Sequence, residues 1–433
     1  MSASDVVRLL AVAALAALSQ LGMPSAQAVS PPEIDDKWLP KPALPAPPSP
    51  TLQREVCAAM TADPKPGRDR LPDLVDLPQV WQLTRGAGQR VAVIDTGVAR
   101  HPRLPDVVPG GDYVSTGDGT QDCDAHGTLV AGIVAATSDP KADGFSGVAP
   151  DATVIGIRQS SAKFAPAGDQ SRTGVGDVDT MAKAIRTAAD LGASVINISS
   201  IACVPVASAL DDRALGAALA YAVDVKNAVI VAAAGNIGGA GQCPSQRPDA
   251  NWQTVTVVVS PAWYDDYVLT VGSVNADGMP SAFTLAGPWV DVAATGEAVT
   301  SLGSEPVSGT SYAAPLVSGL AALIRARFPA LTARQVMRRI ESTAHHPPAG
   351  WDPLVGNGTV DALAAVSTDS SPPTTTAKPT PAPVPITTPP PPKPPNSHAR
   401  DSALRGAAIC LLGLVGVLAS VRLRGPRNRV PGD

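Results

Sequence analysis

Short apolar runs alternate with helical patterns through the middle of this chain, and this alternation limits the folds that the chain can adopt. The apolar, β-branched runs that predict buried strands are residues 90–95, 152–158, 193–199, 228–236, 254–260 and 267–274. The predicted helices are residues 126–137, 177–191, 210–226 and 311–328. This order favours a doubly wound, parallel α/β sheet with flanking helices. Ligands of such sheets bind beyond the carboxyl ends of the strands, where Asp95, Ser199-Ser200 and Asn236 stand.

The first residues, 1–28, have the features of a signal peptide. Arg8 precedes the apolar run Leu9–Leu18, and Ala26-Gln27-Ala28 has the small-x-small form that signal peptidase accepts. An uncleaved N-terminal anchor is the alternative. Both interpretations predict that the chain is exported.

A second apolar run, Gly406–Val421, predicts a single transmembrane helix over residues 402–423. At ~1.5 Å per residue the run reaches about 24 Å, so the flanking Arg405 and Arg422 must snorkel to span a ~30 Å hydrocarbon core. Three further arginines lie in the tail, residues 424–433: Arg424, Arg427 and Arg429. The positive-inside rule therefore predicts a cytoplasmic C-terminus and a main domain on the extracytoplasmic side of the cell membrane.

Two proline-rich segments separate the main domain from the ends of the chain. Within the linker, residues 367–401, the stretch 371–395 holds twelve prolines and predicts a polyproline II stalk; an SH3-type ligand is the alternative. Residues 29–75 are also rich in proline and lack the alternation that a sheet requires. We therefore expect them to form an N-terminal extension that wraps along the folded domain, residues 76–366.

The charge of the chain argues against nucleic acid as a partner. It has 33 basic and 38 acidic residues, a net charge of −5, and so no basic excess. Proteins that bind nucleic acid usually carry a basic patch that neutralises phosphates.

Three motifs stand in the order Asp, His, Ser, and each lies at the end of a predicted element. Asp95 ends the strand in VAVIDTGV, His126 begins the helix in DAHGTLVAG, and Ser311 begins the helix in SGTSYAAP. A serine hydroxyl becomes nucleophilic when a histidine takes its proton, and a buried carboxylate orients that histidine. Each motif alone is weak, because such residues commonly serve as helix caps. Together, and in the order known for subtilisin, they predict a catalytic triad.

Asn236 supplies a fourth element of the predicted active site. It ends the strand in VAAAGN, where its side-chain amide can donate a hydrogen bond to the oxyanion of a tetrahedral intermediate.

These four stretches resemble the subtilisin family of serine endopeptidases, over roughly residues 76–366. The extension, the proline-rich linker and the C-terminal anchor resemble, more narrowly, the mycosins, which are membrane-anchored proteases of mycobacterial type VII secretion systems. The resemblance implies a protein or peptide substrate and a place in the membrane complex of such a system. It implies no cofactor. It leaves calcium binding open, although the sequence has no compact acidic loop that requires a metal.

The resemblance also implies that Ser199, Ser200 and Gly235 bind substrate. Many subtilisins continue with glycines after the serine of this strand, whereas this chain reads NISSIACVP. We expect Ile201 and Cys203 to crowd the edge to which a peptide would add. This departure predicts narrow specificity.

Four of the five cysteines lie in the exported part of the chain, where disulfides persist. Four cysteines allow three pairings. We expect Cys203 to pair with Cys243, because they follow the ends of adjacent predicted strands, and Cys57 to pair with Cys123. A metal site is the alternative, but no CxxC or paired-histidine spacing supports it.

Two functional hypotheses follow. The first is a membrane-anchored serine endopeptidase with few substrates. The second is a structural component of the secretion complex in which proteolysis is secondary. The triad and Asn236 favour the first, while the crowded strand, the extension and the anchor favour the second.

Overall fold

The computed structural model describes residues 29–59, 77–139, 144–169, 171, 173–208, 210–239, 242–303 and 305–367. The predicted signal peptide, transmembrane helix and tail, and all but the first residue of the predicted linker, lie outside these residues. Within the described ranges, no helix combines the length and apolarity needed to cross a membrane.

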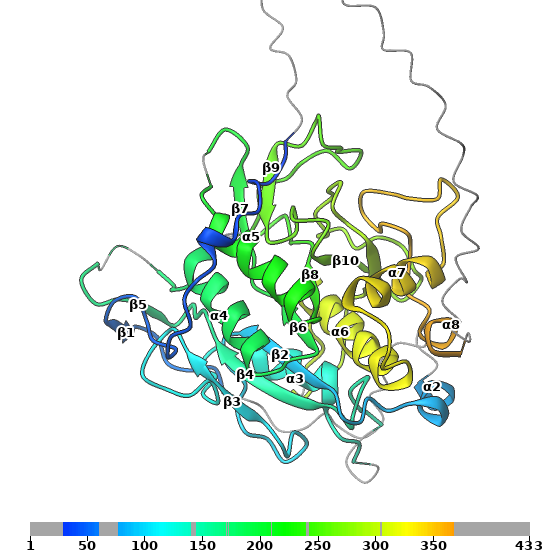
Figure 1. Cartoon of the computed structure of the whole chain (residues 1–433), viewed down its shortest axis with the longest axis horizontal. Coiled ribbons are helices and arrows are strands. Elements are labelled where there is room, and N and C mark those ends of the chain that lie inside the picture. The colour runs from blue at the N-terminus through cyan, green and yellow to red at the C-terminus, as the bar shows by residue number, and fades with distance from the viewer. Residues whose placement is uncertain are drawn as a thin grey trace, which may run out of the picture. The chain divides into compact units, whose positions relative to one another are not determined.

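A seven-stranded parallel sheet forms the centre of the fold, as the alternation of the sequence predicts (Figure 1). Its strands, in spatial order, are β11 (Val292–Thr295), β10 (Leu269–Val274), β8 (Val229–Ala233), β6 (Val195–Ile198), β2 (Arg90–Asp95), β4 (Thr153–Arg158) and β3 (Val108–Asp112). The central strands are buried along nearly their whole length, which is typical of a parallel sheet with helices on both faces. The predicted α/β fold is confirmed.

Helices pack on the sheet in two groups. The described helices are η1 (Asp36–Trp38), α2 (Leu77–Leu83), α3 (His126–Ala135), α4 (Val178–Asp190), α5 (Arg213–Ala220) with the π-helical turn η2 (Tyr221–Val225), α6 (Thr310–Arg327), α7 (Ala333–Thr343) and α8 (Ala362–Ser367). Helix α4 packs against α5, and α3 packs against α6. Asp177 caps α4 and Thr332 caps α7, each within a capping box, so both helices begin where the sequence supplies a cap.

One predicted strand does not join the main sheet. Strand β9 (Val257–Ser260), within the apolar run 254–260, pairs antiparallel with β7 (Ala202–Pro205) and forms a separate ribbon. The end of this ribbon is tied to the buried carboxylate of Asp212, which accepts hydrogen bonds from Ser260 Oγ and Trp263 Nε1. A local apolar run therefore identified the strand but not its partner.

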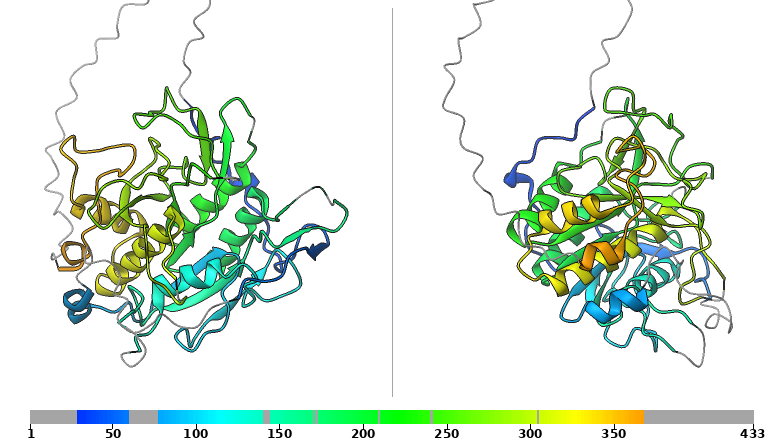
Figure 2. Two further views of the ribbon diagram at one scale, coloured as in Figure 1. Left: turned by 180° about the vertical axis from the view of Figure 1, so that it is seen from behind. Right: turned by 90° about the vertical axis from the view of Figure 1, so that its right-hand side faces the viewer.

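The N-terminal extension contributes a strand of its own. Residues of β1 (Thr51–Gln53) pair antiparallel with β5 (Phe164–Pro166), which lies in the loop between β4 and α4. In Figure 1 and the left view of Figure 2, the dark-blue β1 lies beside the green loop that carries β5. The Ser- and Gly-rich sequence of the loop predicts irregular structure, and β5 forms there because a partner strand arrives from the extension.

Further contacts hold the extension along the folded domain. Near its start, the Val29 amide donates to the Trp252 carbonyl at 2.8 Å. In its middle, the Trp38 ring lies under the Arg213 guanidinium, 3.8 Å from the ring centroid. At its described end, Cys57 is joined to Cys123 by a disulfide.

The disulfide leads to a prediction about processing. A backbone cut anywhere between Cys57 and Cys123 leaves two pieces that are joined covalently. We therefore expect mature protein to retain the extension, with an N-terminus at or near Val29, as determined by N-terminal sequencing of chain isolated from membranes. Non-reducing and reducing gels of the same sample provide the control. A single N-terminus between Leu77 and Val91 would show instead that the extension is removed as a propeptide.

Candidate active site

The three predicted triad residues meet at the carboxyl edge of the sheet. His126 Nδ1 lies 2.7 Å from Asp95 Oδ1, and His126 Nε2 lies 3.0 Å from Ser311 Oγ. Strand β2 carries Asp95 at its carboxyl end, while α3 and α6 present His126 and Ser311 from their first turns. Chain order reverses beside β2, since β4 lies on one side of it and β6 on the other. Binding sites of open α/β sheets occur at such a switch point.

Charge around His126 favours its protonated form. Burial alone would lower the pKa of the imidazole, but the charge of Asp95 and its hydrogen bond, with smaller contributions from Asp122 and Asp124, outweigh burial and raise the pKa above its ordinary value. Asp95 is fully buried, and its Oδ1 also accepts from the Thr96 amide at 2.7 Å. A carboxylate fixed in this way orients the ring and stabilises the imidazolium.

A proline inside α6 frees the backbone carbonyl of Ser311. Pro315 has no N–H, so it cannot donate to the carbonyl four residues earlier. The hydroxyl of Ser199 donates to the Ser311 carbonyl instead, at 3.0 Å, and Asn197 Nδ2 donates to that hydroxyl at 2.9 Å. The side chain of Ser199, predicted to bind substrate, therefore anchors the start of α6. A proline in a helical pattern was the sequence signal for this missing donor.

Asn236 is held so that its amide nitrogen faces the serine. Its Oδ1 accepts hydrogen bonds from the Thr310 amide at 2.9 Å and the Thr310 hydroxyl at 3.0 Å. A Cβ built on Gly309 would lie 3.2 Å from Ser311 Oγ and 3.4 Å from Asn236 Nδ2, so these two atoms flank the same space. Thr310 was not predicted as a site residue, although it lies between the glycine and the serine of the SGTS motif.

Two pockets lie beside this centre, and Ile201 lines both. The first has a volume of about 230 Å³ and is lined by Ser199, Ile201, Cys203, Ala233, Gly235, Asn236, Gln242, Cys243 and Thr310. The second has a volume of about 120 Å³, and its lining includes Ser160, Val175, Met181, Ser200 and Ile201. The three residues predicted to contact substrate thus line pockets: Ser199 and Gly235 the first, Ser200 the second.

The predicted disulfide partners also meet near the site. Cys203 is joined to Cys243 in the wall of the first pocket, and Cys57 is joined to Cys123 in the loop before His126. Among the residues that the structure describes, no three His, Cys, Asp or Glu side chains are grouped so that they could hold a metal ion.

Comparison with known proteins relates this geometry to one family. The profile of the subtilase family of peptidases matches residues 86–358. Mycosin-4 of Mycobacterium tuberculosis (strain ATCC 25618 / H37Rv) is 71% identical over an alignment of 457 positions that covers 100% of both chains.

Solved structures agree with the sequence comparison. The MycP3 protease from the type VII (ESX-3) secretion system is 45% identical, with a TM-score of 0.72 over 79% of this chain and 100% of that chain. A chain in an intact ESX-5 inner membrane complex is 40% identical, with a TM-score of 0.71 over 91% of this chain and 100% of that one.

The electrostatics of His126 predict how reactivity depends on pH. Reaction of Ser311 with a fluorophosphonate requires neutral His126 to accept the hydroxyl proton, so the rate should fall as pH drops through the histidine pKa. Since that pKa is raised above 6.5, we expect the rate to be half-maximal above pH 6.5. Labelling rates measured from about pH 5 to 8 test this. A rate that stays constant across this range would contradict the role of His126 as base.

Proposed function

Because this chain belongs to the subtilase family and, within it, to the mycosins, it is a subtilisin-like serine protease, and we propose that Asp95, His126 and Ser311 are its catalytic triad. The observation that carries this proposal is the continuous chain of contacts from the buried carboxylate through the imidazole to the hydroxyl, 2.7 Å and 3.0 Å long.

The geometry supports the following steps. His126 Nε2 takes the proton of Ser311 as Oγ attacks the carbonyl carbon of the scissile peptide bond. The resulting oxyanion accepts hydrogen bonds from Asn236 Nδ2 and from the backbone N–H of Ser311 at the start of α6. The C–N bond then breaks, and His126 gives its proton to the leaving amine. Water, deprotonated by His126, hydrolyses the acyl-enzyme and restores the serine.

The first pocket is proposed to hold the side chain on the acyl side of the scissile bond, because it opens beside Asn236. Ser199, Ser200 and Gly235 contribute to the substrate cleft through the pockets they line. Ile201 forms a partition between the two pockets, and the Cys203–Cys243 disulfide stiffens the wall of the first. Narrow specificity follows from this partition.

We infer that the protease acts within a type VII secretion system at the inner (cell) membrane. Two similar proteins support this inference: the MycP3 protease of a type VII secretion system and the matching chain in the ESX-5 inner membrane complex. A signal peptide at 1–28, a linker at 367–401, a single transmembrane helix at 402–423 and a cytoplasmic tail at 424–433 would hold the protease domain, residues 76–366, on the extracytoplasmic side.

The second candidate function is structural. A chain similar to this one forms part of an assembled inner membrane complex, and the extension and the anchor add surfaces that peptide hydrolysis does not need. In this alternative the domain stabilises the complex and proteolysis is secondary.

Replacing the nucleophile separates the two functions. We expect Ser311→Ala to lower peptide hydrolysis by on the order of 10⁶-fold, the scale of loss when a triad member is removed. Secretion is measured in cells that lack the chain and are complemented with the parent, with Ser311→Ala, or with Ser342→Ala on the exposed part of α7 as control. Secretion restored by Ser311→Ala would support the structural function. Hydrolysis at the parental rate by this variant would overturn the triad.

A second prediction concerns specificity. Ile201→Ala removes the partition between the pockets, so kcat/KM should rise for substrates with larger side chains near the scissile bond. A change of about tenfold in the ratio of kcat/KM for large over small side chains is expected, since one methylene is worth tenfold or more in such pockets. A peptide-library digest measures the ratio, with Val206→Ala beyond β7 as control. An unchanged library profile would exclude Ile201 as a determinant of specificity.

A further inference from the structure

Asp122 lies four residues before His126. Its carboxylate is hydrogen-bonded to both the segment that follows Asp95 and the helix turn that carries His126. Its Oδ1 accepts a hydrogen bond from the Thr96 hydroxyl at 2.8 Å, and Thr96 directly follows Asp95. Its Oδ2 accepts from the amide and the hydroxyl of Thr128, at 2.8 Å and 2.7 Å, in the first turn of α3. One carboxylate thus joins the end of β2 to the start of α3.

The start of α3 depends on this carboxylate for its cap. The N-cap residue, Ala125, has a φ of 66° and no side chain that can accept a hydrogen bond. Asp122 Oδ1 accepts from the Ala125 amide at 2.9 Å, and Oδ2 from the Thr128 amide, so Asp122 satisfies donors that an ordinary cap residue would satisfy. A carboxylate at this end also interacts favourably with the helix dipole.

The backbones that Asp122 joins lie in close contact. A Cβ on Gly127 would lie 2.1 Å from the Gly97 carbonyl oxygen and 3.0 Å from Asp95 Cβ. The Thr96 hydroxyl, which donates to Asp122, also accepts from the Gly127 amide at 2.9 Å. A shift of the loop that carries Asp122 would therefore move His126 relative to Asp95.

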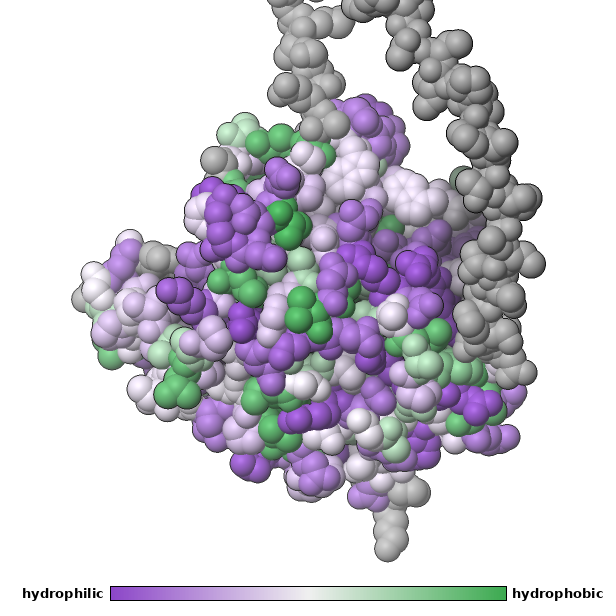
Figure 3. Space-filling model, viewed as in Figure 1, coloured by the Kyte–Doolittle hydropathy of each residue, from purple (hydrophilic) through white to green (hydrophobic). Residues whose placement is uncertain are grey.

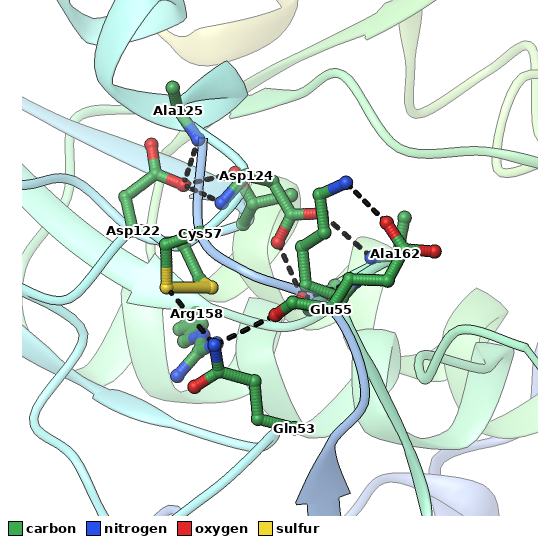
Figure 4. Close-up of a disulfide and its surroundings, with 12 residues drawn as sticks. Gln53, Glu55, Cys57, Asp122, Asp124, Ala125, Arg158 and Ala162 are labelled. Atoms are coloured by element: carbon green, nitrogen blue, oxygen red, sulfur yellow. Dashed lines mark hydrogen bonds and ion pairs between the residues drawn. A yellow bond between two sulfur atoms is a disulfide. The ribbon is translucent and has the colours of Figure 1, made fainter. Parts of the chain in front are cut away.

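The loop is itself held by the disulfide and by contacts of Asp124 (Figure 4). The disulfide joins Cys123 to Cys57 of the extension, and the backbone carbonyl of Cys123 accepts a hydrogen bond from the Ala58 amide at 2.8 Å. Asp124 Oδ1 accepts from the Ala162 amide at 2.8 Å, in the loop between β4 and α4. The extension and this loop thus fix the segment from which Asp122 acts.

Asp122 also adds a second negative charge near the imidazole. The ionisable groups that face His126 are the carboxylates of Asp95, Asp122 and Asp124 and the phenol of Tyr312, whose ring centroid lies 5.1 Å from that of His126. Burial raises the pKa of the Asp122 carboxyl, although its hydrogen bonds from Thr128 and Thr96 oppose this. In its ionised form Asp122 favours the imidazolium that forms during catalysis.

We propose that Asp122 is a positioning residue for the reaction: it fixes His126 against Asp95 and supplies part of the negative field at the imidazole. This proposal rests on the proposed function of Ser311 as nucleophile and His126 as base. Asp122 contacts neither substrate nor the reacting atoms.

Asp122→Asn keeps the shape of the side chain but removes its charge and replaces one acceptor oxygen with a donor that faces other donors. In the full chain, the rate at which a fluorophosphonate labels Ser311 should fall by on the order of tenfold to a hundredfold, the scale expected for a misplaced catalytic group. The acid limb of the rate profile should also move to lower pH, because the negative field at His126 weakens. Asp118→Asn, in the same loop and bonded to Thr120, is the matched control and should change neither quantity.

Two further measurements keep the proposal testable if Asp122→Asn folds poorly. Thr96→Val removes the hydroxyl that joins Asp122 to the turn after Asp95 but keeps every charge, so labelling should slow while the acid limb stays where it is. Titration of the His126 Cε1 signal by NMR, assigned by its loss in His126→Ala, reads the imidazole pKa without any reaction. It should fall in Asp122→Asn and stay at the parental value in Thr96→Val.

The outcomes are distinguishable. Parental labelling rates and parental acid limbs in both Asp122→Asn and Thr96→Val would overturn the proposal. A slower rate in Asp122→Asn with an unmoved His126 titration would reduce Asp122 to a structural role and equally overturn it. A parent chain whose Ser311 is not labelled would instead overturn the proposed function, while the NMR titration would still test the link between Asp122 and His126.

Discussion

The buried carboxylate of Asp95 is the constraint on which the rest of the site depends. A carboxylate without solvent is costly unless it is paired and hydrogen-bonded. Asp95 Oδ1 is bound by the Thr96 amide and His126 Nδ1, while its buried Oδ2 has no hydrogen-bond partner among the residues that the structure describes. In the proposed mechanism, donation from Nδ1 to Asp95 leaves Nε2 free to accept the serine proton. The parallel sheet places Asp95 at the edge where α3 and α6 begin. The close contact between Gly127 and Gly97 then lets His126, at the start of α3, reach the Asp95 carboxylate.

The sequence predicted those strands and site residues whose positions depend on the local pattern of apolar and polar residues. Apolar runs predicted β2, β4, β6, β8 and β10, because each of these strands is buried along its length and needs no other signal. The Asp, His and Ser motifs lie within hydrogen-bond distance because each stands at the carboxyl end of a strand or at the start of a helix, positions that a parallel sheet brings to one edge. Strand β3, with the sequence VPGGD, has no such pattern and forms only through pairing with β4.

Long-range pairing limited the rest of the prediction. The run 254–260 reads as one more strand of the sheet, yet β9 pairs with β7 because Asp212 holds its end elsewhere. Ser199, predicted to bind substrate, lines the first pocket, and its hydroxyl also donates to the Ser311 carbonyl that Pro315 leaves free, a contact that no local pattern indicates. Both outcomes depend on contacts with residues far away in the chain. On the face shown in Figure 3, apolar residues form small separate groups among polar ones, so surface hydropathy does not identify a partner surface there.

The pairing of β1 with β5 has a consequence for the order in which the protein can assemble. Residue 51 pairs with residue 166, and Cys57 with Cys123, so the extension has no partner until much of the sheet has been delivered. In a chain that crosses a membrane N-terminus first, the extension emerges early and waits as a proline-rich strand with exposed backbone donors. Its prolines lack backbone N–H donors, so the extension is a poor template for aggregation until β1 pairs with β5. If the chain is exported as we propose, the segment that finally secures the His126 loop crosses the membrane before that loop does.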